Sequence, residues 1–256
     1  GKIVERNAAG EEVRPLDISI TKNVLGLFIN SAVLSVIMMS CVRWYKKHPL
    51  EDGAPKGGVG MIEATVLSIY NDVIKGCIGE NYRRYAPYLL TAFFFVLVNN
   101  LMGLIPIFPG GANVTGNIAI TLVLALCTFV LTNVYGTKAY WKEIFWPDVP
   151  TWLKAPIPMM PLIEFFGIFT KPFALMIRLF ANIMAGHAAV LSLVAIIFIT
   201  VKSGPVINGS MTVVSVAFSI FMDALEILVA FIQAYVFTML SAVFIGLSQV
   251  KEHAEK

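Results

Sequence analysis

The sequence predicts an all-α membrane protein with about five membrane-crossing helices plus interfacial helices. Hydrophobic residues make up 57% of the 256 residues, charged residues only 14%, and the mean hydropathy is +0.78. Soluble domains carry about 25% charged residues, so this composition is typical of a polytopic membrane protein. Apolar runs of about 20 residues, the length that a ~30 Å hydrocarbon core requires, recur along the chain. The last two apolar runs are about twice that length, which predicts long, strongly tilted helices paired as an antiparallel hairpin.

A polar tail, residues 1–21, precedes a single polytopic membrane domain, residues 22–256. The first span covers residues 23–42, the second residues 85–107 and the third residues 114–135. The second span contains two adjacent amides, Asn99 and Asn100, which we interpret as groups that hold helices together.

Two stretches between the spans favour an interfacial location. Residues 61–84 mix charges into an apolar pattern, which suits a helix lying in the interface better than one that crosses the membrane. Residues 140–161 combine three Trp and five Pro with few charges and read as an aromatic connector at the interface.

The final two helices are predicted at residues 161–200 and 210–249, and together they form a hairpin over residues 160–249. Each has about 40 residues, or ~60 Å at 1.5 Å per residue, which is twice the hydrocarbon thickness. Either they kink, for example at Pro172, or they lie strongly tilted across the membrane. The turn that joins them is VKSGPVING.

The placement of Lys and Arg predicts the orientation of the chain. Basic residues gather in the loops on one side of the membrane. On the other side, the loop between the second and third spans has no basic residue, and the last turn has only Lys202. Cytoplasmic loops carry the excess of Lys and Arg, so we expect the C-terminus in the cytoplasm and the N-terminus outside. The loops assigned to the cytoplasm hold Arg43, Lys46, Lys47, Lys56, Lys75, Arg83, Arg84, Lys138, Lys142, Lys154, Lys251 and Lys256.

Arg178 is a permanent cation in an otherwise lipid-embedded helix. A charge at such depth costs at least ~3 kcal/mol on insertion scales, and such charges normally serve a function with a partner. Glu164 and Lys171 precede it at intervals of seven residues, and Asn182 follows it by four, so all four side chains share one stripe of the helix.

Folding the hairpin about its turn predicts two polar levels. Counted from the turn, Arg178 and Gln233 lie 27 and 28 residues away, whereas His187 lies 18 away, level with Asp223 and Glu226 at 18 and 21. The imidazole and carboxylate groups form the level nearer the outside, and they can exchange protons when they are hydrated. The Arg level holds a charge that cannot titrate and that bars another cation. Together they predict an offset ion path with a charged barrier in the middle.

Structural interpretations compete with these functional ones. His187 could be an interhelical hydrogen-bond donor, although its match with Glu226 favours function. Asp223 could simply hydrate the outer mouth. The side chains of Glu164 and Lys171 are better explained as reaching toward the cytoplasmic interface than as taking a direct part in ion transport. The three cysteines, Cys41, Cys77 and Cys127, have no metal-ligand spacing, and we expect no metal and no cofactor.

Three segments together closely resemble subunit a of the F-type ATP synthase membrane sector. They are RLFANIMAGH with Lys171-Pro172 just upstream, EILVAFIQAYVFTML, and the earlier NNLMGLIPI. The resemblance covers about residues 85–248. In that family the subunit is the stator against which a ring of c subunits rotates, and two tilted helices contact the ring.

The resemblance implies a role for each matching residue. Arg178 falls on the essential arginine that separates two aqueous half-channels and displaces the proton from each c-subunit carboxylate. Gln233 matches the glutamine that faces this arginine, and Asn182 the asparagine one turn after it. His187 and Glu226 fall on the acid–imidazole pair of the outer half-channel, with acid and imidazole exchanged relative to some members.

Further expectations follow from the same resemblance. Glu164 and Lys171 fall on positions that are often polar in the family, whereas Asp223 has no family assignment and is interpreted as widening the outer mouth. The implied partners are the c-subunit ring, with a mid-membrane carboxylate opposing Arg178, the b-type peripheral stalk subunits and the rest of the synthase, in a bacterial inner membrane, with no nucleic acid. The resemblance leaves H⁺ and Na⁺ open as the transported ion.

Two other function classes compete with a stator subunit. An ion-coupled secondary transporter with its site at Arg178 and Glu226 is disfavoured because the chain has no internal or inverted repeat and no paired Gly/Pro-broken helices. A non-transporting scaffold protein would not need ionisable residues at matched depths.

Overall fold

The computed structural model describes residues 5–6, 12–13, 21–48, 55–105, 114–145 and 159–249. Nearly all of them are helical, which confirms the predicted all-α architecture. A short antiparallel strand pair, β1 (Glu5–Arg6) and β2 (Glu12–Val13), lies in the polar tail. The helices are α1 (Lys22–Lys47), α2 (Gly58–Ser68), α3 (Gly76–Ile78), α4 (Tyr82–Leu104), α5 (Ile118–Val134), α6 (Lys138–Phe145), α7 (Met159–Thr200) and α8 (Pro205–Ser248).

The described residues contain four helical stretches long and apolar enough to cross a membrane, or five if α5 and the sharply bent α6 count as one span. The bend between α5 and α6 is 99°. This count agrees with the predicted number of about five. The four stretches are Lys22–Lys47, Gly58–Leu104, Pro161–Ser203 and Pro205–Ser248.

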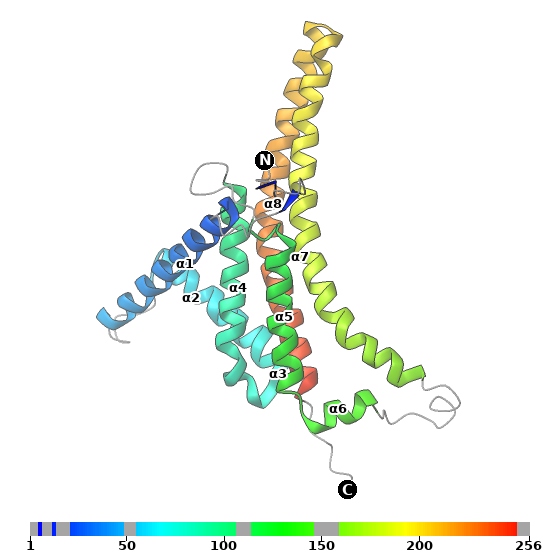
Figure 1. Ribbon diagram of the computed structural model, residues 1–256. Helices are drawn as coiled ribbons and strands as arrows, with labels where there is room; N and C mark the ends of the chain where they lie inside the picture. Colours follow the sequence, from blue (N-terminus) through cyan, green and yellow to red (C-terminus); the bar gives the residue numbers. More distant parts are fainter. Residues whose placement is uncertain are drawn as a thin grey trace.

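Helices α7 and α8 form the predicted antiparallel hairpin (Figure 1). The turn is tighter than predicted, because α8 begins at Pro205 and not at residue 210. Proline suits the first turn of a helix, where its missing N–H would be unpaired in any case. Gly204 before it has φ 102°, a conformation that favours glycine. The Thr200 hydroxyl closes the turn by donating to Asn208 Oδ1 at 2.9 Å.

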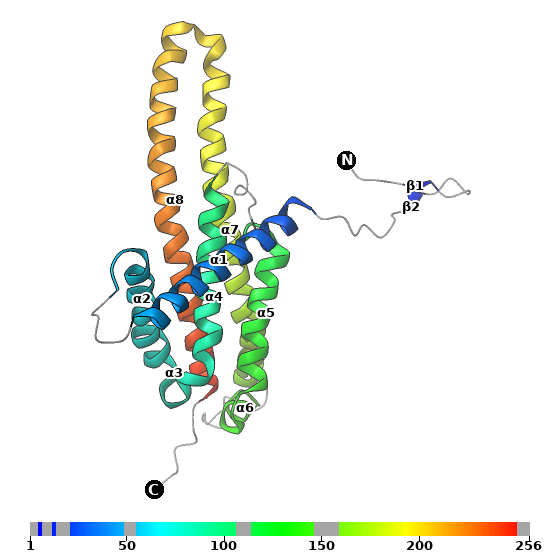
Figure 2. The same ribbon diagram turned by 90° about the vertical axis from the view of Figure 1, so that its left-hand side faces the viewer.

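The two hairpin helices differ in shape. Helix α7 curves away from α8 toward its N-terminal end (Figure 1). Pro172 lies in that part of α7, and a proline inside a helix removes one backbone hydrogen bond and favours a bend. The tip of the hairpin extends well beyond the other helices in both views (Figure 2).

The remaining helices pack around the lower part of the hairpin. Helix α4 packs against α8, and α5 packs against α7. The Nδ2 of Asn30 in α1 donates to Oδ1 of Asn99 in α4 at 2.9 Å, while the Nδ2 of Asn100 donates to the carbonyl oxygen of Ala230 in α8 at 3.3 Å. The two amides of the second span therefore hold α4 to two different helices, as predicted.

The predicted interfacial segment, residues 61–84, folds into α2, a π-helical turn (Ile69–Lys75), α3, and a 3₁₀ turn (Gly79–Asn81) that leads into α4. Ile69, Val73 and Ile74 are fully buried, so the apolar side of this segment belongs to the core beside α4 and α8. Most of the predicted aromatic connector after α6 lies outside the described residues.

Candidate functional site

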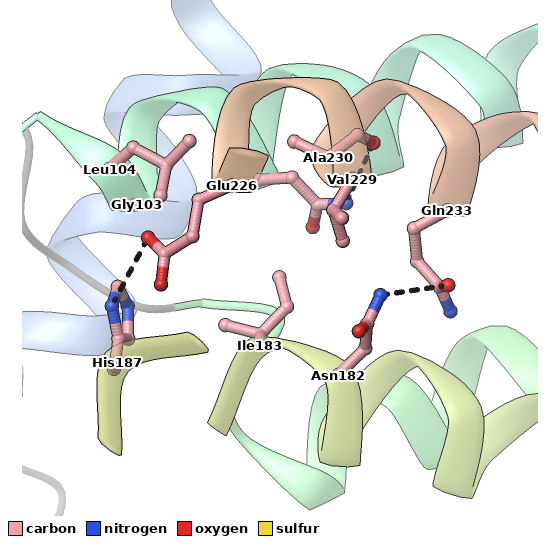
Figure 3. A pocket seen from close by; sticks show the side chains of 10 residues that line it. Gly103, Leu104, Asn182, Ile183, His187, Glu226, Val229, Ala230 and Gln233 are labelled. Atoms are coloured by element: carbon pink, nitrogen blue, oxygen red, sulfur yellow. Dashed lines mark hydrogen bonds and ion pairs between the residues drawn. The ribbon is translucent and has the colours of Figure 1, made fainter. Parts of the chain in front are cut away.

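His187 of α7 faces Glu226 of α8 in the middle of the hairpin (Figure 3). The distance from His187 Nδ1 to Glu226 Oε2 is 3.9 Å, and the two side chains are 32% and 12% exposed. The pair of ionisable groups that helix counting placed at one level is thus in contact. A protonated imidazole at this distance would attract the carboxylate strongly, because little water separates the two groups.

Asn182 and Gln233 form a second contact between α7 and α8 (Figure 3). Asn182 Nδ2 donates to Gln233 Oε1 at 3.2 Å, and Gln233 is only 5% exposed. Both residues had been predicted at the arginine level, so the structure joins two of the three members of that level directly.

The partner of Gln233 differs from the predicted one, whereas His187 and Glu226 meet at the predicted level. Counted from the first residue of α8, His187 is 18 residues away and Glu226 is 21 away. On the same count Asn182 is 23 away and Gln233 is 28 away. Helical side chains lean toward the N-terminus of their own helix, which is away from the turn in α7 and toward it in α8. When two side chains meet across the hairpin, the α8 residue is therefore more residues away from the turn than its α7 partner. For this reason Gln233 bonds to Asn182, which lies one turn nearer the hairpin tip than Arg178.

A cavity of about 30 Å³ lies between the two contacts. It is lined by residues of α4, α7 and α8, and both contacts open onto it. Two side-chain atoms of these contacts, Glu226 Oε1 and Gln233 Nε2, are buried and have no hydrogen-bond partner among the described residues. The lining residues are Asn100, Gly103, Leu104, Asn182, Ile183, His187, Glu226, Val229, Ala230 and Gln233.

Gly186 makes room for the Glu226 carboxyl group. A Cβ at this glycine would overlap Glu226 Oε1 and come within 2.9 Å of its carboxyl carbon. The site therefore includes a residue that the sequence interpretation missed, because a glycine inside a helix carries no chemical signal of its own. Its position next to His187 was the one available clue.

Asn100 was also missed as a site residue. The adjacent amides in the second span were interpreted only as contacts between helices, and the Asn100 Nδ2 does make such a contact. Its other atom, Oδ1, is buried, has no hydrogen-bond partner among the described residues, and belongs to a residue that lines the cavity.

Arg178 is placed differently from the cavity residues. It is exposed on α7, and within the described part of the chain it has no hydrogen-bonding or ionic partner. Asp223 on α8 is exposed as well and does not line the cavity. Its position one turn before Glu226 keeps it on the same side of α8.

Lys171 and Glu164 lie toward the N-terminal end of α7, away from the cavity. Lys171 is half-buried, and its Nζ lies 5.9 Å from the ring centre of Phe244 in α8. Glu164 is half-buried two turns earlier. Neither residue contacts the His187–Glu226 pair.

The described residues hold no group of three or more His, Cys, Asp or Glu side chains that could bind a metal ion.

Comparison with known proteins gives a consistent result. A family profile described as ATP synthase A chain matches residues 25–246. The chain is 49% identical over 246 residues to ATP synthase subunit a of Chlorobium phaeobacteroides, covering 93% of this chain and 68% of that one. It is 44% identical over 245 residues to ATP synthase subunit a of Chloroherpeton thalassium (94% and 70% covered). It is 39% identical over 244 residues to ATP synthase subunit a of Myxococcus xanthus (93% and 75% covered).

Proposed function

The chain belongs to the ATP synthase subunit a family, and we propose that it is the proton-translocating stator of an F-type synthase. In this role it provides two offset half-channels to a rotating c-ring, with Arg178 as the barrier between them. The observation that carries the proposal is the contrast between two sites on one hairpin. Ionisable and amide groups meet at a small cavity between helices, whereas the fixed cation nearby is exposed and unpaired within the described chain.

The cavity side supplies the outer half-channel. An imidazole and a carboxylate can each bind and release a proton, and a small side-chain movement of His187 or Glu226 would close their 3.9 Å separation to a hydrogen bond that transfers it. Asn182 and Gln233 extend the polar lining toward the arginine, and Asp223 hydrates the entrance.

Arg178 forms the barrier because its guanidinium remains charged at any working pH. An unpaired cation at membrane depth is costly, which favours a carboxylate supplied by another chain. The mid-membrane carboxylate of a c subunit fits this requirement. When it comes close to Arg178, the positive charge favours its ionised form, so its proton leaves.

The chain is a multi-pass membrane protein that assembles with the rest of the synthase. We place it in a bacterial inner membrane with the N-terminus outside and the C-terminus in the cytoplasm, beside b-type stalk subunits. The positions of the described basic residues support this orientation. Arg83, Arg84 and Lys138 lie at the ends of helices opposite the hairpin tip, which carries only Lys202.

Copurification tests the assignment against an ion-coupled transporter. A tagged chain extracted in mild detergent should bring down small two-helix subunits that carry a mid-membrane carboxylate. Isolation of this chain alone, combined with substrate uptake in liposomes, would favour the transporter and refute the stator assignment.

Replacing Gly186 with alanine should slow proton pumping about tenfold. The added methyl group cannot share space with the Glu226 carboxyl group, which is the end of a flexible side chain and must move aside. If this movement takes Glu226 away from His187, a loss near 1.4 kcal/mol in the transfer step corresponds to the tenfold change. The measurement is ATP-driven acidification of reconstituted vesicles, normalised to assembled synthase.

Gly167→Ala is the matched control, because a Cβ at Gly167 of the same helix meets no atom within 4 Å. That variant should pump like the wild type. Equal rates for both alanine variants would show that the space at Gly186 has no role in translocation.

A further inference from the structure

An open apolar groove runs between α4 and α5 and shares no residue with the cavity beside the His187–Glu226 pair. The two helices run side by side, but α4 packs against α8 and α5 packs against α7, which leaves the groove between them (Figure 1). The volume of the groove is about 420 Å³. Tyr88 lines it from α4, and the α5 wall consists of Val123, Leu126, Cys127, Val130 and Leu131.

The surface of this groove suits hydrocarbon and not water. The Tyr88 hydroxyl group is already hydrogen-bonded to the Thr128 hydroxyl group of α5 at 2.8 Å, and Cys127 adds only a weak thiol donor. Val123 and Val130 are 58% and 50% exposed. Because the groove lies along two membrane helices, the hydrocarbon part of a lipid is the natural cover for these side chains.

Arg84 stands at the end of the groove at which α4 begins and α5 ends. Its guanidinium carbon lies 4.3 Å from the ring centre of Tyr135, the residue that follows α5. Arg84 is four residues before Tyr88, so it lies on the same side of α4, about 6 Å further along the helix axis. It is exposed, and within the described part of the chain no carboxylate pairs with it. One end of the apolar groove therefore carries a cation that an anion can reach.

We propose that one anionic phospholipid binds along α4 and α5, with an acyl chain in the groove and its phosphate group at Arg84. Tyrosine rings are enriched at the headgroup level of a membrane, and the Tyr85 and Tyr135 rings contact each other at this end. Basic sites between transmembrane helices bind the headgroups of anionic lipids. Arginine suits a phosphate group especially well, because its guanidinium can donate two parallel hydrogen bonds.

The size of the groove favours an acyl chain over a transmembrane helix of another subunit. From Val123 to Leu131, α5 rises by ~12 Å at 1.5 Å per residue. A helix with its side chains is about 10–12 Å wide, so a stretch of that length occupies on the order of 1,000 Å³. This is more than twice the volume of the groove, whereas an acyl chain is far thinner. The proposal requires only that the chain lies in a membrane, and it does not depend on the stator role.

Photochemical labelling of the intact synthase tests the lipid site. The synthase is reconstituted into phosphatidylcholine vesicles that contain a trace of one probe lipid, either phosphatidylglycerol or phosphatidylcholine, with a diazirine in one acyl chain. Label on residues 123–131 is then quantified by peptide mass spectrometry, relative to label on α1. We expect about fivefold more label from the anionic probe, which corresponds to the ~1 kcal/mol that one basic side chain contributes near an anionic lipid surface.

Two arginine variants separate the headgroup contact from general lipid exposure. Arg84→Gln should reduce the ratio of anionic to neutral label to about one, because it removes the charge and leaves the groove unchanged. Arg83→Gln is the matched control, since Arg83 Nε donates to the Tyr82 hydroxyl group at 3.4 Å and projects from a different side of α4. This control should keep the ratio near fivefold.

Equal labelling by the two probes in the wild type would overturn the proposal, as would an equal loss of preference in both variants. A density map of the synthase in nanodiscs of phosphatidylglycerol and phosphatidylcholine gives an independent check. An elongated density should fill the groove, with its head within hydrogen-bonding distance of Arg84. A transmembrane helix of another subunit in the groove, or a lipid whose head lies away from Arg84, would refute the proposed site.

Discussion

Replacing Arg178 with alanine will abolish ATP-driven proton pumping by the reconstituted synthase. Arg178 is the only arginine of the hairpin, residues 160–249, and its charge cannot be removed by proton transfer. It lies between the cavity and the N-terminal part of α7. Without it, nothing expels the proton from a ring carboxylate and nothing separates the two half-channels. We expect pumping to fall by more than about 100-fold, which corresponds to the loss of more than ~2.7 kcal/mol in the coupled step.

The measurement is acidification of vesicles after addition of ATP, with the amount of assembled synthase determined separately. Lys171→Ala is the matched control, since it removes a cation two turns earlier on the same helix, where Nζ lies near the Phe244 ring. This control should retain most of the wild-type rate. Wild-type pumping by Arg178→Ala would disprove the assignment of Arg178 as the barrier.

Replacing Glu226 with glutamine should slow proton translocation about 100-fold. Glutamine keeps the size of the side chain and can still bond to its neighbours, so the variant removes little except the ability to exchange a proton. Loss of a positioned acid–base group typically costs about 10²–10⁴ in rate. Both ATP-driven pumping and passive proton flux through the membrane sector would report the effect.

Glu164→Gln is the control for this prediction. It makes the same chemical change on α7, two turns from Lys171, at a residue that does not contact the His187–Glu226 pair. We expect a rate within about twofold of the wild type, as for an exposed or half-exposed charge outside the path. Equal effects of the two glutamine variants would refute the assignment of Glu226 to the outer half-channel.

The helical architecture was predictable because the bilayer sets the length of an apolar run. The final hairpin follows from two stretches twice that length around the Gly204-Pro205 turn. The exact start of α8 was not predictable from hydropathy, because Asn208 and Gly209 are poor helix formers in isolation and are accommodated here by the hairpin contact from Thr200.

The contact between His187 and Glu226 was predictable by counting residues from the turn, since both helices rise by the same amount per residue. The partner of Gln233 was not, because counting treats side chains as if they projected straight outward. Their lean toward each N-terminus shifts contacts by several residues, and this shift joins Gln233 to Asn182 instead of placing it opposite Arg178.

The roles of Gly186 and Asn100 depend on packing between three helices. A glycine matters here only because the Glu226 carboxyl group occupies the space beside it. Asn100 uses one atom as a helix contact and leaves the other at the cavity, a division that the residue type alone does not reveal.

The partner of Arg178 in the proposed mechanism is a carboxylate on another chain. A density map of the assembled synthase tests this most directly, by the distance from the Arg178 guanidinium to the mid-membrane carboxylate of the nearest c subunit. We expect the two groups to face each other across the interface, in direct contact or bridged by a single water, at about 3–5 Å. An Arg178 side chain directed into lipid, or paired with an acidic residue of its own chain, would contradict it.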